Sequence, residues 1–115
     1  MSNDRGPAAA VDPLALGRAV TDAYRNVSLS EVNDHEIRMS VMTGPFRWHR
    51  HPDSDETFLG VEGELVIEFR DRELVVAPGR LVTVPAGVPH RTRPAGTRSV
   101  NLTFERAGAE TIFEE

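Results

Sequence analysis

Cysteine and lysine are both missing from this 115-residue chain, and its 13 basic residues are all arginines. Without cysteine, the protein has no thiolate nucleophile, no disulfide, no iron–sulfur cluster and no sulfur-ligated zinc site. Without lysine, it cannot form a Schiff base with a substrate carbonyl. Any catalytic or metal site must therefore be built from histidine, carboxylate, hydroxyl and arginine groups.

The chain also lacks an excess of positive charge and a long apolar run. Its 18 acidic residues outnumber the basic ones and give a formal net charge of -5, whereas nucleic-acid-binding domains usually carry a basic patch. No apolar run approaches the roughly 20 residues of a membrane-spanning helix, and the N-terminus lacks the pattern of a secretory signal. We therefore expect a cytoplasmic protein with no nucleic-acid or membrane partner.

The length suits one compact domain. Asp12 is a good helix N-cap and Pro13 suits the first helical position, so one short helix is predicted over residues 13–24. The expected organisation is a flexible N-terminus with this helix (residues 1–28), a β-domain (29–107) and a loosely attached acidic tail (108–115).

After the predicted helix, short runs typical of β-strands alternate with turn signals at intervals of about eight to twelve residues. The expected strands cover residues 37–42, 46–51, 57–61, 64–69, 73–76, 81–84, 90–93 and 99–105. This number of strands, joined by tight turns rich in glycine and proline, favours an all-β jelly roll.

A histidine pair is the first candidate for chemistry. His49 and His51 lie two residues apart in an expected strand, so their side chains would face the same side. Glu56 begins the next expected strand and can fold back towards them, and His90 is a further candidate ligand. Imidazole and carboxylate groups without sulfur suit Fe, Mn, Ni, Cu or Zn better than calcium or magnesium. A solvated turn among charged neighbours is the alternative interpretation.

Two segments resemble the sequence motifs of the cupin superfamily. Residues 44–63, GPFRWHRHPDSDETFLGVEG, look like the first motif, which has a glycine, a His-x-His pair, a glutamate and a closing glycine. Residues 79–90, GRLVTVPAGVPH, resemble the second motif, with glycine, proline, glycine and histidine at the family's spacing. The chain departs from many cupins at Pro94, where they have asparagine. The resemblance covers about residues 33–105 and is strongest to small single-domain cupins.

This resemblance implies a double-stranded β-helix, or jelly-roll barrel, with one short N-terminal helix. His49, His51, Glu56 and His90 stand at the family's four metal-ligand positions, which implies one divalent transition metal (Fe, Mn, Ni, Cu or Zn) per chain. Dimers are common among similar barrels, and a dimer would cover an exposed edge strand. A homodimer is therefore expected.

Strand alternation extends the predicted pocket beyond these ligands. It would turn Arg47 into the barrel, where its guanidinium could bind an anionic substrate, although pairing with a surface acid is the alternative. Gly60 either enlarges the pocket or marks a β-bulge. His35 lies in a polar, turn-like segment and is expected on the surface.

The resemblance favours a metal-dependent enzyme that acts on a small anionic organic molecule. Oxygenase chemistry leads, isomerase or lyase chemistry follows, and Glu56 and Arg47 are the expected catalytic residues. A non-catalytic metal-binding, ligand-binding or sensing module is the alternative. A protein-interaction role with a vestigial site is disfavoured, because the ligand set is complete. The fold alone cannot choose among these functions.

Overall fold

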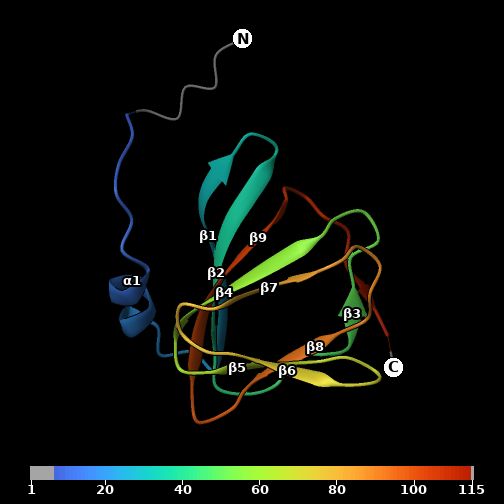
Figure 1. The fold of residues 1–115 in the computed structure, drawn as a ribbon. Coiled ribbons are helices and arrows are strands. Elements are labelled where there is room, and N and C mark those ends of the chain that lie inside the picture. The colour runs from blue at the N-terminus through green and yellow to red at the C-terminus, as the bar shows by residue number, and fades with distance from the viewer. Residues whose placement is uncertain (1–6, 115) are drawn as a thin grey trace.

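The computed structural model describes residues 7–114, in which two facing β-sheets are accompanied by one short helix (Figure 1). The elements are α1 (Pro13–Ala19), β1 (Tyr24–Val32), β2 (His35–Met42), β3 (His49–Arg50), β4 (Glu56–Glu62), β5 (Leu65–Glu68), β6 (Glu73–Val76), β7 (Leu81–Val84), β8 (Arg91–Pro94), β9 (Ser99–Arg106) and β10 (Ile112–Phe113). The predicted all-β architecture with one N-terminal helix is confirmed.

The strands are paired antiparallel throughout the described residues. The larger sheet has the order β1-β2-β9-β4-β7, the smaller one has the order β6-β5-β8, and β10 pairs with β3. Apolar side chains fill the space between the two larger sheets. This core consists of Met42, Phe58, Leu65, Ile67, Val76 and Val84. The arrangement is the predicted jelly roll.

The outer face of the larger sheet carries a second apolar cluster, beside α1. Met39, Val41 and Val100 are buried there, because alternate residues of β2 and β9 point away from the inner face. Helix α1 begins as predicted, with the Asp12 carboxylate accepting a hydrogen bond from the Ala15 backbone N–H. No helix within residues 7–114 is long and apolar enough to cross a membrane.

The N-terminal region differs from the prediction. The helix ends at Ala19 rather than at residue 24, and β1 follows and pairs with β2 along nearly its whole length. The expected boundary at residue 28 therefore falls inside a strand, so residues 24–28 belong to the sheet. The first six residues of the predicted flexible segment lie outside the described part of the chain.

Gly60 marks a bulge and a close approach between two backbones. The register between β4 and β9 shifts between Gly60 and Glu62, which confirms the bulge interpretation. The Gly60 N–H donates to the Arg80 carbonyl at 2.9 Å, and the Gly79 N–H donates back to the Gly60 carbonyl at 2.9 Å. A Cβ at position 60 would overlap the Ala77 carbonyl oxygen. Gly60 does not line the cavity described below. The space left by its missing side chain is occupied by neighbouring backbone and does not enlarge the cavity.

Gly60→Ala is expected to lower the free energy of unfolding by about 2 kcal/mol, because the added methyl group must displace packed backbone. Urea denaturation measures this loss. Gly96→Ala is the matched control, since that glycine is exposed and a Cβ there meets nothing within 4 Å. Equal unfolding midpoints for the two variants would contradict the explanation.

Candidate metal centre

Backbone pairing brings the two histidine-bearing segments together. The His49 N–H donates to the His90 carbonyl at 3.0 Å, and the His90 N–H donates back to the His49 carbonyl at 2.9 Å. The Gly87 N–H also donates to the His51 carbonyl at 2.8 Å. Glu56 enters the same site as the first residue of β4. Residues far apart in the sequence are thus held in fixed register by hydrogen bonds.

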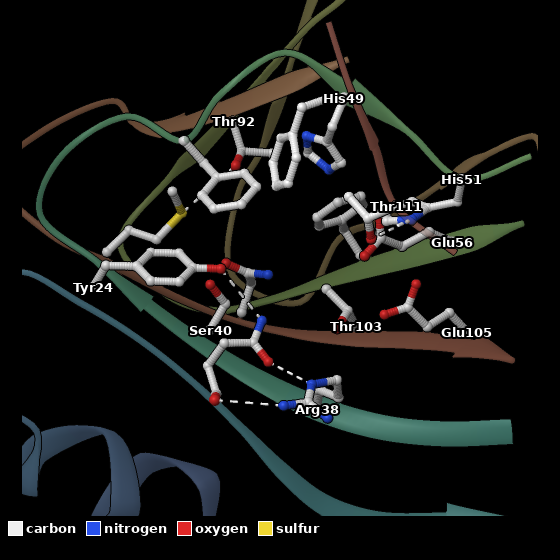
Figure 2. Close-up of a pocket in the computed structure, with 16 residues that line it drawn as sticks. Tyr24, Arg38, Ser40, His49, His51, Glu56, Thr92, Thr103, Glu105 and Thr111 are labelled. Atoms are coloured by element: carbon white, nitrogen blue, oxygen red, sulfur yellow. Dashed lines mark hydrogen bonds and ion pairs between the residues drawn. The ribbon is translucent and has the colours of Figure 1, made fainter. Parts of the chain in front are cut away.

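The four predicted ligands converge in one buried group, and Figure 2 shows three of them, His49, His51 and Glu56, at one end of the cavity. One ligand atom from each of His49, His51, Glu56 and His90 lies within 4.8 Å of the others. The ring centres of His49 and His90 are 4.4 Å apart, and those of His49 and His51 are 5.0 Å apart. All four side chains are buried, and His90 is only 1% exposed. They form a group that can bind a metal ion.

Each of the three histidines is oriented by a backbone carbonyl. Nδ1 of His49 lies 2.7 Å from the Arg47 carbonyl oxygen, Nδ1 of His90 lies 2.9 Å from that of Val88, and Nδ1 of His51 lies 3.1 Å from that of Glu110. A carbonyl oxygen only accepts hydrogen bonds, so each Nδ1 must carry the proton. When its ring is neutral, each histidine therefore presents an unprotonated Nε2, as metal ligation requires.

The carboxylate of Glu56 is the electrostatic centre of this group. Its Oε1 lies 3.2 Å from Nε2 of His51 and 3.3 Å from Nε2 of His90. Burial raises the pKa of Glu56, but hydrogen bonds with the two histidines outweigh it and lower the pKa to about 2. The hydrogen bond with Glu56 raises the pKa of His51 to about 9, whereas burial lowers the pKa of His49 to about 4.

These pKa shifts locate the protons within the four-residue group. A pKa of about 9 places a proton on His51 beside the ionised Glu56 carboxylate, whereas a pKa of about 4 leaves His49 neutral at physiological pH. Metal binding requires neutral imidazole and ionised carboxylate groups. Three imidazoles and one carboxylate without sulfur fit Fe, Mn, Ni, Cu or Zn, as the sequence predicted.

A cavity of about 250 Å³ opens beside the cluster. Met42, Phe46 and Phe58 contribute apolar surface, whereas β2 and β9 contribute polar side chains. Figure 2 shows the labelled histidines at one end of this cavity and Arg38 at the opposite end. The arrangement leaves room for a small ligand next to the four candidate metal ligands.

Arg47 does not point into the barrel. Its side chain is exposed, its guanidinium lies 4.3 Å from the centre of the Phe113 ring, and it is absent from the cavity lining. Strand β3 begins only at His49, so the alternation of a strand does not extend back to residue 47. The expected inward orientation is wrong, and a direct catalytic role for Arg47 has no support from its position.

Arg38 is the arginine that lines the cavity, and the sequence interpretation missed it. Its guanidinium donates to Glu36 Oε1 at 2.8 Å and to Asn26 Oδ1 at 2.5 Å, so neighbouring groups already engage its charge. One feature of the sequence indicates this position: Arg38 and Ser40 alternate with apolar residues in the expected strand over residues 37–42.

Polar residues on β9 were missed as well. Asn101, Thr103 and Glu105 all line the cavity. Burial, the largest cause, raises the pKa of Glu105 to about 7. His35, by contrast, is exposed as expected and pairs with Asp34 at 2.8 Å.

The C-terminal segment is part of the site rather than a loose tail. Strand β10 pairs with β3, and Thr111 and Phe113 line the cavity. The C-terminal segment is also held to β3 by Arg50, whose Nε donates to Glu114 Oε2 at 2.9 Å. Because the Glu110 carbonyl also orients His51, the predicted boundary at residue 108 separates residues that are in contact.

Comparisons with known proteins agree with this architecture. A Bacillus subtilis (strain 168) protein, "Uncharacterized protein YdbB", is 47% identical over 103 residues, which cover 89% of this chain and 90% of that protein. A cupin-2 domain containing protein from Shewanella frigidimarina NCIMB 400 is 26% identical with a TM-score of 0.77, over 84% of this chain and 93% of that one.

A more distant solved structure has a named activity. DMSP lyase DddQ from Ruegeria pomeroyi DSS-3 is 20% identical with a TM-score of 0.69, over 80% of this chain and 52% of that one. This likeness shows a shared fold alone. The family model described as "Cupin domain" matches residues 35–104. The match spans more than half of the sequence and includes all four candidate ligands, so the chain belongs to the cupin domain family.

Proposed function

We propose that this protein is a metal-dependent enzyme that acts on a small organic molecule, with oxygenase chemistry as its reaction. The observation that carries the proposal is the buried convergence of three imidazoles and one carboxylate, of which His49, His51 and Glu56 line a cavity. A purely structural cluster would not need a cavity beside it. Pockets of this kind, with a few convergent polar groups, are the usual places for small-molecule chemistry.

His49, His51, His90 and Glu56 would hold the metal ion. A divalent transition metal bound there supplies Lewis acidity to a substrate oxygen and, if it is redox-active, electrons for reaction with dioxygen. The protein's own contribution is orientation. The backbone carbonyls fix all three rings through Nδ1, so the site does not reorganise when a ligand enters.

The rest of the cavity controls access and binding. Phe46 and Phe58 pack edge-on against His49 and His90, with ring centres 5.1 Å and 6.0 Å apart, and so limit water on that side. Arg38 lies at the far end and is paired with Glu36. An anionic group of the substrate is therefore best accommodated at the histidine end, where a metal ion would balance its charge.

Reconstitution tests this function. Chelator-treated protein is loaded separately with Fe(II), Mn(II), Ni(II), Cu(II) and Zn(II), and bound metal is measured by elemental analysis. Oxygen uptake is then followed with diketone, phenolic and keto-acid substrates. We expect about one ion per chain, because one four-ligand cluster is present, and oxygen uptake that matches substrate loss with one redox-active metal.

The other outcomes are equally informative. Substrate conversion without oxygen uptake would replace the oxygenase proposal by a lyase or isomerase. Full metal loading without conversion of any tested substrate would favour the non-catalytic binding or sensing module. A protein that binds none of the five ions would overturn the metal-dependent function altogether.

A further inference from the structure

A row of unpaired polar groups lies on the cavity face of β9. Asn101, Thr103 and Glu105 occupy alternate positions of this strand, and all three line the cavity. Asn101 is 1% exposed and Thr103 is 3% exposed. Asn101 Oδ1, Thr103 Oγ1 and Glu105 Oε2 are buried and have no hydrogen-bond partner within residues 7–114. We call these three side chains the β9 polar row.

Such a row is costly for a protein that has no ligand to bind. A buried polar group without a hydrogen bond destabilises the folded state, and most proteins therefore pair nearly all of them. Valine in place of Thr103 would fill the same space without an unpaired hydroxyl. Three unpaired groups on one face of one cavity are best explained by a ligand that supplies their partners.

The atom types specify what the ligand must offer. Asn101 Oδ1 can only accept hydrogen bonds, an ionised Glu105 carboxylate also accepts, and the Thr103 hydroxyl can do either. The matching ligand therefore presents donors, of which hydroxyl groups are the simplest. An anion offers acceptors only, so it could not pair with Asn101 Oδ1 or with an ionised Glu105 carboxylate.

The neighbouring strands support this assignment. The register of β2 with β9 places Arg38 opposite Thr103 and Ser40 opposite Asn101. The Arg38 guanidinium is engaged by Glu36 and Asn26, so its charge is not free to bind an anion next to the row. Figure 2 shows Glu105 and Thr103 along β9, with Glu105 at the end nearer His51 and Glu56. The row thus leads away from the candidate metal centre.

We propose that the substrate is a short polyhydroxylated molecule whose hydroxyl groups donate hydrogen bonds to the β9 polar row while its metal-binding oxygens face the three histidines. Only the part of this inference that concerns the metal-binding oxygens rests on the proposed function. The cavity of about 250 Å³ lies at the small end of ligand pockets, which suits a short chain.

Two probes of equal carbon number test the proposal. D-Erythronate and 2-hydroxybutyrate share an α-hydroxy acid that can chelate a metal, but only erythronate carries two further hydroxyl groups. Calorimetric titration of the Zn(II)-loaded protein, in which zinc excludes redox turnover, is expected to show about tenfold tighter binding of erythronate. In Thr103→Val this preference should fall to about twofold or less, while the affinity for 2-hydroxybutyrate stays unchanged.

Thr57→Val is the matched control. Thr57 lies on β4 outside the cavity lining, and its Oγ1 is 2.7 Å from Thr83 Oγ1. This variant should keep the preference for erythronate. A second readout does not depend on any ligand: Thr103→Val should raise the melting temperature of the ligand-free protein, because it removes an unpaired buried hydroxyl, whereas Thr57→Val should not.

The two proposals fail in different ways. The proposed function fails if none of the five ions binds, and the probe ratio in the metal-free protein then decides whether the substrate is polyhydroxylated. Equal affinity for the two probes, or no binding of erythronate, would overturn the polyhydroxylated substrate even if zinc is retained. A preference that survives in Thr103→Val would remove Thr103 from the binding site.

Discussion

His49→Ala is expected to abolish stoichiometric metal binding, with a loss of at least about 100-fold in affinity. Even residues that only orient a metal ligand typically contribute 10-fold to 100-fold in affinity, so removal of a ligand itself should cost about 100-fold or more. His49 is buried, its Nδ1 proton is fixed by the Arg47 carbonyl, and its Nε2 faces the cluster. Elemental analysis after dialysis against a weak chelator measures the loss.

The chain offers a matched control in its fourth histidine. His35 is exposed, pairs with Asp34 and is not part of the cluster, so His35→Ala should retain the metal content of the wild type. His49→Gln keeps most of the side-chain volume and tests whether the loss reflects a missing ligand rather than a collapsed core. Full metal content in His49→Ala, with the fold verified by circular dichroism, would remove His49 from the ligand set.

The sequence indicated the candidate ligands because each of them lies in or beside a short segment whose conformation depends on local residues. His49 and His51 flank one position, Glu56 follows the next turn, and His90 ends a turn that contains Gly87. Each of these placements depends on a short segment whose conformation its own residues favour; Gly87, for example, has a φ of 82°. The structure brings these four side chains together because two such turns are hydrogen-bonded to each other.

The orientation of the Arg47 side chain could not be predicted from strand alternation. Alternation predicts side-chain direction only within a continuous strand, and the residues just before His49 do not belong to one, although the Phe46 N–H donates to the Thr92 carbonyl and the Trp48 carbonyl accepts from the Glu114 N–H. The guanidinium is free to turn outwards and stack on Phe113, a residue that the sequence interpretation had assigned to a loose tail. The orientation of Arg47 therefore depends on a partner more than 60 residues away.

Strands β1 and β10 were missed for a related reason. The sequence of β1, YRNVSLSEV, is mostly polar and exposed, so it lacks the apolar signal of a strand. Its identity comes from hydrogen bonds to β2, and that of β10 comes from pairing with β3. Propensity cannot supply such non-local pairings, and β-structure depends on them more than helical structure does.

The β9 polar row was visible as alternation but not as a site. Asn101, Thr103 and Glu105 alternate with apolar residues, and in an isolated sheet such a pattern predicts a solvent-facing side. Only the opposing sheet turns that polar side into the inside of a cavity, with Leu102 packed in the outer cluster instead. The alternation thus gave the two faces correctly, while the choice of the inner one required the tertiary structure.

Deletion of residues 109–115 is expected to weaken metal binding by about 10-fold to 100-fold, because it removes the carbonyl that orients His51. Nδ1 of His51 lies 3.1 Å from the Glu110 carbonyl oxygen and 3.3 Å from Thr111 Oγ1. Without these acceptors the ring can rotate, so Nε2 is no longer held towards the cluster. Competition with a chromophoric chelator measures the change in affinity.

A point variant keeps this prediction testable if the truncated protein does not fold. The Asp53 carboxylate accepts the Glu110 N–H at 3.0 and 3.3 Å, so Asp53→Ala should loosen the same peptide and weaken metal binding in the same direction, by less than the deletion. Glu114→Gln is the control, because it weakens the ion pair with Arg50 but leaves the Glu110 carbonyl in place. If Asp53→Ala and Glu114→Gln both bind metal as tightly as the wild type, orientation of His51 by this segment does not contribute to the affinity.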